Sequence, residues 1–218
     1  KANYIDPKLR SNKLFLTVLQ ARKTREKTKF SIGDIGNPSC STGLTSNPLI
    51  LNRIVEAELI ANLYEMNSRE LYKTKDARFG NGRCSPDFNL FDDERPIIKT
   101  VAEDLISIIT KAVKTDVYVC DSFFNILGAG GGSNPHNHIV SEDEGVLSLA
   151  NQKYSLVYYL SVGDQNCSEP GMLKLYEPAE DVLPGEGMIT IIPASRERSA
   201  VYGGKADRVG IGVNFYSL

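Results

Sequence analysis

The chain has 218 residues, of which 41% are hydrophobic and 24% are charged. This composition is typical of a globular domain rather than of disordered or membrane proteins. Acidic residues slightly outnumber basic ones, 27 against 25. The chain therefore lacks the basic excess with which proteins bind nucleic acids, and we expect no nucleic-acid partner.

The chain shows no sign of a membrane or secretory segment. No apolar run approaches the length of a membrane-spanning helix, and the N-terminus lacks the pattern of a signal peptide. The four cysteines, Cys40, Cys84, Cys120 and Cys167, are scattered and form no C-x-x-C pair. This spacing argues against a zinc knuckle and against a disulfide framework. We therefore predict reduced thiols in a cytoplasmic protein without a membrane partner.

The first half of the chain predicts helices and irregular segments. The apolar run 14–19 is interpreted as a strand. Segments 31–48 and 74–93 are rich in Gly, Pro, Ser and Asn, and are predicted to be loops, either ordinary surface loops or covers over a substrate site. Apolar residues at helical spacing predict one helix over 54–64 and a second over 96–112.

The second half is typical of β structure. From Asp116 onward, runs rich in Val, Ile, Tyr and Phe alternate with Gly-rich or Pro-rich turns. The predicted strands are 117–127, 154–162, 172–176, 187–192, 199–202 and 208–216. Helices followed by strands, without a β-α alternation, favour a mainly β (α+β) jelly-roll over a doubly wound sheet. We expect a single domain over 1–218, with a helical and loop-rich part at 1–115 and a jelly-roll core at 116–218.

Both histidines of the chain lie in Asn134-Pro135-His136-Asn137-His138, directly after the glycine-rich run 128–132. In an extended segment residues i and i+2 project from one face, so the two imidazoles could share a metal. Imidazole suits Fe, Zn, Cu and Ni, and two of them leave positions for a third ligand, water or substrate. The alternative is a pair of exposed or hydrogen-bonded histidines at a strand edge. The glycines are expected to bend the chain sharply before His136, since no long helix follows them as it would in a dinucleotide site.

Several segments of the second half occur in a recognisable order. They are Phe124-Asn125-Ile126, His136-Asn137-His138, 154–160, 171–175, 184–193 and 207–215. In this order the chain resembles the iron(II)/2-oxoglutarate-dependent oxygenases, in a variant with H-x-H in place of the usual H-x-D. The resemblance covers 117–215, about half of the chain. It implies a double-stranded β-helix, Fe(II) as cofactor, 2-oxoglutarate as cosubstrate, and a dioxygenase that hydroxylates an unidentified substrate.

The resemblance also implies roles for single residues. His136 and His138 match the metal-binding pair, and Arg208 matches the basic residue that binds the far carboxylate of 2-oxoglutarate; a solvated or ion-paired surface role is the alternative for Arg208. Two further candidates for cofactor binding follow from the residues themselves. Asn125 is polar within an apolar run and needs a buried partner or a pocket. Tyr158 belongs to a tyrosine-rich strand, in which core packing is the alternative.

The sequence departs from the family at the third metal ligand. A distal histidine should lie near Ser199, shortly before Arg208, and none is present; the neighbouring Arg198 is not a usual iron ligand either. Three hypotheses stay open. The first is an oxygenase in which a carboxylate, 2-oxoglutarate or water completes the metal sphere. The second is a degenerate oxygenase fold that keeps the pocket without redox chemistry, and the third is a β-sandwich module that binds a ligand or partner directly. The nearby carboxylates are Glu142, Glu144 and Glu197.

Overall fold

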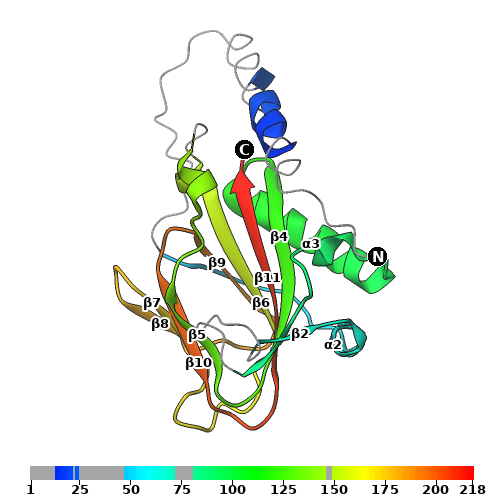
Figure 1. Ribbon diagram of the computed structural model, residues 1–218, viewed down its shortest axis with the longest axis vertical. Coiled ribbons are helices and arrows are strands. Elements are labelled where there is room, and N and C mark those ends of the chain that lie inside the picture. The colour runs from blue at the N-terminus through cyan, green and yellow to red at the C-terminus, as the bar shows by residue number, and fades with distance from the viewer. Residues whose placement is uncertain (1–12, 22, 25–46, 72–80, 146–148) are drawn as a thin grey trace.

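The computed structural model describes residues 13–21, 23–24, 47–71, 81–145 and 149–218. Two antiparallel sheets form its frame (Figure 1): one of seven strands, in the order β1-β9-β6-β11-β4-β3-β2, and one of four, in the order β5-β10-β7-β8. The strands are β1 (Leu49–Asn52), β2 (Arg69–Glu70), β3 (Gly82–Cys84), β4 (Val117–Leu127), β5 (Gly131–His136), β6 (Lys153–Ser161), β7 (Leu173–Leu175), β8 (Glu180–Val182), β9 (Met188–Pro193), β10 (Arg198–Tyr202) and β11 (Arg208–Ser217).

Two α-helices pack against the larger sheet, α2 (Ala57–Glu65) and α3 (Pro96–Val113). Proline suits the first turn of α3, and Lys114, in the left-handed conformation, follows its last turn. The apolar stripe of α3 joins that of α2 in one buried cluster with the sheet. Residues 13–21 and 23–24 are also helical. The short 3-10 turns are η2 (Leu90–Asp92), η3 (Ser141–Glu144) and η4 (Ala150–Gln152).

Alternation along most of β4, β6 and β11 gives the larger sheet two different faces, because successive side chains of a strand point to opposite sides. One face is apolar and packs on the two helices. Its members are Phe124, Ile126, Tyr154, Leu156, Tyr158, Leu160, Val209, Ile211, Val213 and Phe215. The residues between them line a pocket on the other face. These are Phe123, Asn125, Leu127, Ser155, Val157, Tyr159, Arg208, Gly210 and Gly212. The larger sheet is thus a wall between the core and the pocket.

The glycine-rich run forms the turn by which the chain passes from β4 in the larger sheet to β5 in the smaller one. The N–H of Gly131 donates to the carbonyl of Gly128 at 2.9 Å, and Gly130 has a φ of 79°, which favours glycine. The predicted sharp bend is therefore present. It carries His136 to the end of β5, where it pairs across the sheet with Arg198 of β10.

Most of the predicted elements are confirmed within a few residues, including both α-helices and six strands. The predicted strand 14–19 is wrong, because this segment is helical. Leu14 and Val18 lie four residues apart, so in a helix they share one face, and both pack in a small cluster with Tyr216. β1, β2 and β3 extend the larger sheet from the N-terminal part of the chain. The remaining parts of the predicted loops, 31–46 and 74–80, lie outside the described residues.

No helix in the described ranges is long and apolar enough to cross a membrane. Cys84, Cys120 and Cys167 carry free thiols, and Cys40 lies outside the described residues. Burial raises the pKa of Cys120 to about 12, so that thiol stays protonated and unreactive at neutral pH.

Candidate metal centre and ligand pocket

His136 and His138 face each other with their Nε2 atoms 3.2 Å apart. The Nδ1 atom of His136 lies 2.7 Å from the backbone oxygen of Asn134, and that of His138 lies 2.9 Å from the side-chain oxygen of Asn214. Because a carbonyl oxygen only accepts hydrogen bonds, each Nδ1 carries the ring hydrogen. In the neutral rings the lone pairs of the two Nε2 atoms therefore converge on one place.

A hydrogen bond to Asp121 fixes the orientation of the Asn214 amide. Its Nδ2 donates to the carboxylate of Asp121 at 3.2 Å, and a carboxylate only accepts, so the amide oxygen must face His138. Asn214 and Asp121 are cross-strand partners on β11 and β4. Two neighbouring strands of the larger sheet thus set the tautomer of a histidine on the adjoining segment. Metal-binding histidines are commonly oriented in this way.

The environment keeps His138 neutral. Burial lowers its pKa to about 3, and the positive charge of Arg198 and the neighbouring His136 act in the same direction. Two lone pairs 3.2 Å apart repel each other, and a cation between them relieves that repulsion. Two nitrogens that each lie about 2.1 Å from a common metal would have a similar separation. The pair therefore fits a divalent metal at two coordination positions.

No third His, Cys, Asp or Glu among the described residues completes a metal-binding group with this pair. Arg198 lies opposite His136 instead, and its side chain is only 4% exposed. Its Nη2 donates to the carbonyl of Pro193 at 3.1 Å, whereas its Nε and Nη1 have no partner within the described ranges. The adjacent Ser199 hydroxyl lies 2.8 Å from that of Tyr176. A guanidinium thus stands beside the place where the resemblance implied a third ligand.

Arg208 opens β11 and is also buried, at 7% exposure. Its Nη1 donates to the carbonyl of Gly171, and its guanidinium lies 5.0 Å from the centroid of the Tyr159 ring. Gly171 has a φ of 79°, and a Cβ there would lie 1.8 Å from that Nη1. Only glycine therefore allows this position of the arginine.

Burial lowers the pKa of Arg208, as it does that of Arg198, where the value is about 10. Arg198 thus stays charged at neutral pH.

The two histidines stand at the boundary of two pockets. The inner pocket, of about 160 Å³, lies between the sheets and is also lined by Arg198, Arg208 and Tyr159. No Asp or Glu is among the described residues that line it. The outer pocket, of about 450 Å³, shares the histidines. Its other polar and aromatic members include Arg69, Phe88, Asp121, Lys153 and Asn214. A small basic compartment therefore adjoins a larger one with mixed charge.

The structure brings four of the five predicted site residues together, since His136, His138, Arg208 and Asn125 all line the inner pocket. Tyr158 does not join them, and its selection was wrong. Its hydroxyl donates to the carbonyl of Ile54 at 2.8 Å on the helix side of the sheet. Because side chains alternate along β6, the neighbouring Tyr159 faces the pocket instead.

Three residues of the site were not selected from the sequence: Asn214 and Asp121, and Tyr159, which belongs to the same tyrosine-rich strand as Tyr158. The parity of β6 could have identified Tyr159, because it shares a face with Ser155. Nothing in the sequence signals the contact of Asn214 with His138, which depends on the packing of separate elements. Of the nearby carboxylates, Glu144 and Glu197 are exposed and line neither pocket; the side chain of Glu142 lies outside what the structure describes.

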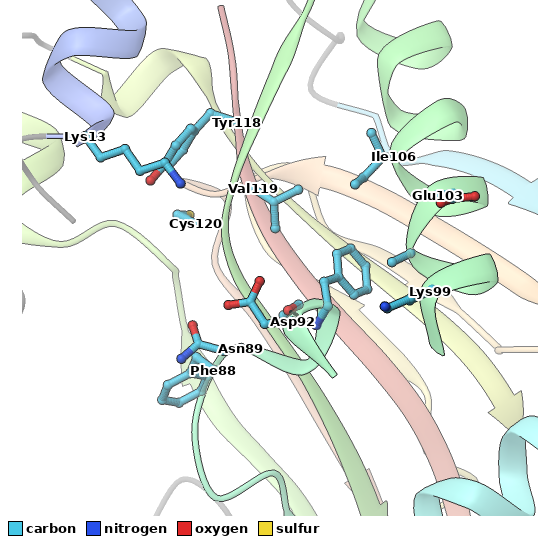
Figure 2. A pocket seen from close by; sticks show the side chains of 13 residues that line it. Lys13, Phe88, Asn89, Asp92, Lys99, Glu103, Ile106, Tyr118, Val119 and Cys120 are labelled. Atoms are coloured by element: carbon cyan, nitrogen blue, oxygen red, sulfur yellow. Dashed lines mark hydrogen bonds between the residues drawn. The ribbon is translucent and has the colours of Figure 1, made fainter. Parts of the chain in front are cut away.

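A larger hollow, of about 640 Å³, lies between α3 and β4 (Figure 2). Figure 2 shows Ile106 of the helix and Val119 of the strand on its two sides, with Lys99 and Glu103 along the helix. No histidine is among the described residues that line it, and its charged side chains have both signs. It has the character of a surface groove of mixed charge.

The sequence matches no known protein family and no curated protein. Solved structures nevertheless share its fold. HygX from Streptomyces hygroscopicus, with nickel and 2-oxoglutarate bound, superposes with a TM-score of 0.61 at 12% identity, over 79% of this chain and 84% of that chain. A prolyl hydroxylase from Trichoplax adhaerens gives 0.57 at 14% identity, over 79% and 84%. A prolyl-4-hydroxylase from Pseudomonas putida gives 0.55 at 14% identity, over 80% and 94%.

This chain has the double-stranded β-helix fold of these oxygenases. The predicted fold class is thereby confirmed, and at such low identities the likeness concerns the fold alone. In the double-stranded β-helix of this chain, β4, β6 and β11 supply one wall of the inner pocket, and β5, β7 and β10 supply the other.

Proposed function

We propose that this protein is a 2-oxoglutarate-dependent oxygenase in which His136 and His138 are the protein ligands of Fe(II). The observation that carries the proposal is the pair of Nε2 atoms 3.2 Å apart, with both Nδ1 hydrogens directed to carbonyl oxygens. Ferrous iron is a common partner of imidazole nitrogen. The fold is the one on which HygX was solved with nickel and 2-oxoglutarate.

The residues of the inner pocket would bind and orient the cosubstrate. Arg208 would pair with the carboxylate farther from the histidines, because a guanidinium held by Gly171 and Tyr159 is ready to make two parallel hydrogen bonds. Asn125 lies at the boundary of both pockets, where its amide can bind either ligand. The bound metal, with 2-oxoglutarate and dioxygen, supplies the oxidising chemistry that hydroxylates a C–H bond.

The outer pocket is where the substrate would lie, since it borders the same two imidazoles from the other side. Its volume, about 450 Å³, is within the range of small-molecule sites, and its lining combines aromatic rings with both charges. Hydroxylation would then occur on the part of the substrate nearest His136 and His138.

One observation favours a second candidate function. Arg198 stands beside the place where a third ligand is expected, and a buried guanidinium repels a divalent cation. A carboxylate-binding protein that has kept the pocket and lost the metal would look the same at this position. The two candidates differ in a single property, which is metal affinity.

An anaerobic titration with Fe(II), with and without 2-oxoglutarate, tests the proposal directly. We expect a weak visible charge-transfer band only when both are present, and no band in the His136→Ala/His138→Ala double variant. Asn137→Ala is the matched control, because this exposed side chain lies between the two histidines and accepts a hydrogen bond from the N–H of Ile139. Absence of the band in the unmodified protein would exclude the oxygenase and leave the carboxylate-binding protein.

A further inference from the structure

The guanidinium of Arg198 is a buried charge for which the proposed chemistry gives no use. We infer that the inner pocket holds a short dicarboxylate by both ends, with Arg198 binding the carboxylate near the histidines and Arg208 the other. The inference rests on the carboxylate-binding role proposed above for Arg208. It assigns to Arg198 a new role, as the residue that selects a ligand with two charges.

Arg198 differs from two other buried cations of this protein, which face carboxylates. Lys153 contacts Asp143 at 2.8 Å, and Arg196 contacts Glu180 at 3.4 Å. Arg198 instead has one carbonyl partner, and its Nε and Nη1 have none within the described ranges. A buried charge without a counter-charge is strongly destabilising. An anion in the pocket would remove this penalty.

The composition of the inner pocket favours an anion. Two guanidinium groups line it, and no carboxylate of the described residues does. The unliganded pocket therefore carries two positive charges, which a dianion would balance and a monocarboxylate would not.

The positions of the two arginines and the size of the inner pocket favour a short ligand with two charged ends. Arg198 begins β10 in the smaller sheet and Arg208 begins β11 in the larger one, so the two charges come from opposite walls. Arg198 lies across from His136, whereas Arg208 lies against Gly171. A volume of about 160 Å³ is small compared with sites for drug-sized ligands, at about 300 to 1,000 Å³. The occupant is therefore a molecule of the size of succinate, glutarate or 2-oxoglutarate.

One consequence is that the dicarboxylate binds without metal, because both of its anchors are guanidinium groups. A second is that dicarboxylate and metal bind cooperatively. Arg198 disfavours a cation at the histidines of the empty pocket, and the bound dianion offsets this charge. By linkage, each ligand then raises the affinity of the other by the same factor.

Calorimetric titrations of the full chain in excess EDTA test the inference with no metal present. The ligands are 2-oxoglutarate, glutarate and succinate, compared with pentanoate and inorganic phosphate. We expect all three dicarboxylates to bind, and pentanoate to bind about 10- to 100-fold more weakly, as the loss of one charged hydrogen-bonded contact implies. Equal affinity for pentanoate or for phosphate would contradict the inference.

Substitution of the arginine provides the second arm. Arg198→Met should weaken dicarboxylate binding by about 10- to 100-fold, and Arg198→Lys should restore part of it. Arg196→Met is the matched control, because Arg196 is equally buried but donates to the carbonyl of Pro178 and does not line the pocket. Full affinity in a folded Arg198→Met variant would contradict the assignment. If that variant does not fold, the comparison of ligands on the unmodified protein decides.

The two proposals fail in different ways. Dicarboxylate binding in EDTA without a charge-transfer band in the iron titration would retain the role of Arg198 and exclude the oxygenase. A charge-transfer band together with full dicarboxylate affinity in Arg198→Met would retain the oxygenase and exclude this role.

Discussion

A single amide, that of Asn214, decides how the candidate metal centre presents one of its two nitrogens. Its oxygen accepts from the Nδ1–H of His138, and its nitrogen donates to Asp121. An aspartate at position 214 would place two carboxylates side by side and repel Asp121. The amide instead accepts at one end and donates at the other, so both neighbours are satisfied.

Loss of this amide should weaken metal binding without removing a ligand. In Asn214→Ala we expect the affinity for Ni(II), a stand-in for Fe(II) that is stable in air, to fall about 10- to 100-fold, the usual cost of removing a partner of a metal-bound histidine. Isothermal titration calorimetry in the presence of 2-oxoglutarate measures it. Asn62→Ala is the control, because this half-buried side chain of α2 donates to the carbonyl of Glu58 and lines neither pocket. Unchanged nickel affinity in Asn214→Ala would show that the contact does not orient the ring.

At the scale of elements, the buried carboxylate of Asp143 holds η3, the turn that follows His138, against the larger sheet. Asp143, in η3, is 0% exposed. It accepts from the N–H of Val140 at 2.8 Å, from Nζ of Lys153 at 2.8 Å and from the hydroxyl of Tyr216. These contacts tie η3 to β6 and β11. They hold in place the chain that runs on from the histidines.

Asp143→Asn should lower the free energy of unfolding by about 3 to 5 kcal/mol, because it leaves the ammonium of Lys153 buried without a counter-charge. Urea denaturation followed by circular dichroism measures the change. Asp181→Asn, at an exposed position of β8, should alter it by about 0.5 kcal/mol or less. Adding Lys153→Met to Asp143→Asn should recover part of the loss. A loss of under 1 kcal/mol in Asp143→Asn would be inconsistent with a buried ion pair.

How far the sequence predicts each element depends on how much of its signal is local. β4, β6 and β11 are long and rich in β-branched and aromatic residues, so their predicted bounds are nearly right. β5 reads Gly-Gly-Ser-Asn-Pro-His, which has no strand preference, and it exists because β10 pairs with it. β1 and β3 have at most four residues each and likewise depend on partners distant in sequence.

The candidate site shows the same division. His136, His138 and Arg208 are detectable from spacing and from resemblance. The choice of Tyr158 over Tyr159 required knowledge of which face of β6 meets the helices, and that depends on tertiary packing. Arg198 was considered only as an unsuitable metal ligand, because its use as an anion site becomes visible only when its burial and its partners are known.

At the scale of the whole molecule, the two sheets have unequal cores. The larger sheet shares an extensive apolar cluster with α2 and α3, whereas the smaller one has a cluster of a few residues around Leu173 and Leu175. Arg208 belongs to the first sheet and Arg198 to the second. A ligand held by both would therefore link the strongly packed sheet to the weakly packed one.

Ligand binding should accordingly stabilise the fold. At a hundred times the dissociation constant, 2-oxoglutarate with Ni(II) should add about 2.7 kcal/mol. For a chain of this length that raises Tm by about 5 to 10 °C. Differential scanning fluorimetry measures the shift, and hydrogen exchange should slow in β7 and β10. EDTA should remove the rise in Tm that is due to nickel and leave the rise that is due to the dicarboxylate. No shift with either ligand would argue against both proposals.

The central place of β11 in the larger sheet affects the stage of folding at which the site forms. This strand, red in Figure 1, lies between β4 and β6, and carries Arg208 at its first residue and Asn214 further along. Its partners on both sides are distant in sequence, and such non-local pairings form late in folding. We therefore expect the carboxylate anchor and the orientation of His138 to form together, when β11 pairs with β4 and β6. We expect a partly folded chain, in which β11 is not yet paired, to bind neither metal nor dicarboxylate. Assembly of the larger sheet is therefore required for the site to bind its ligands.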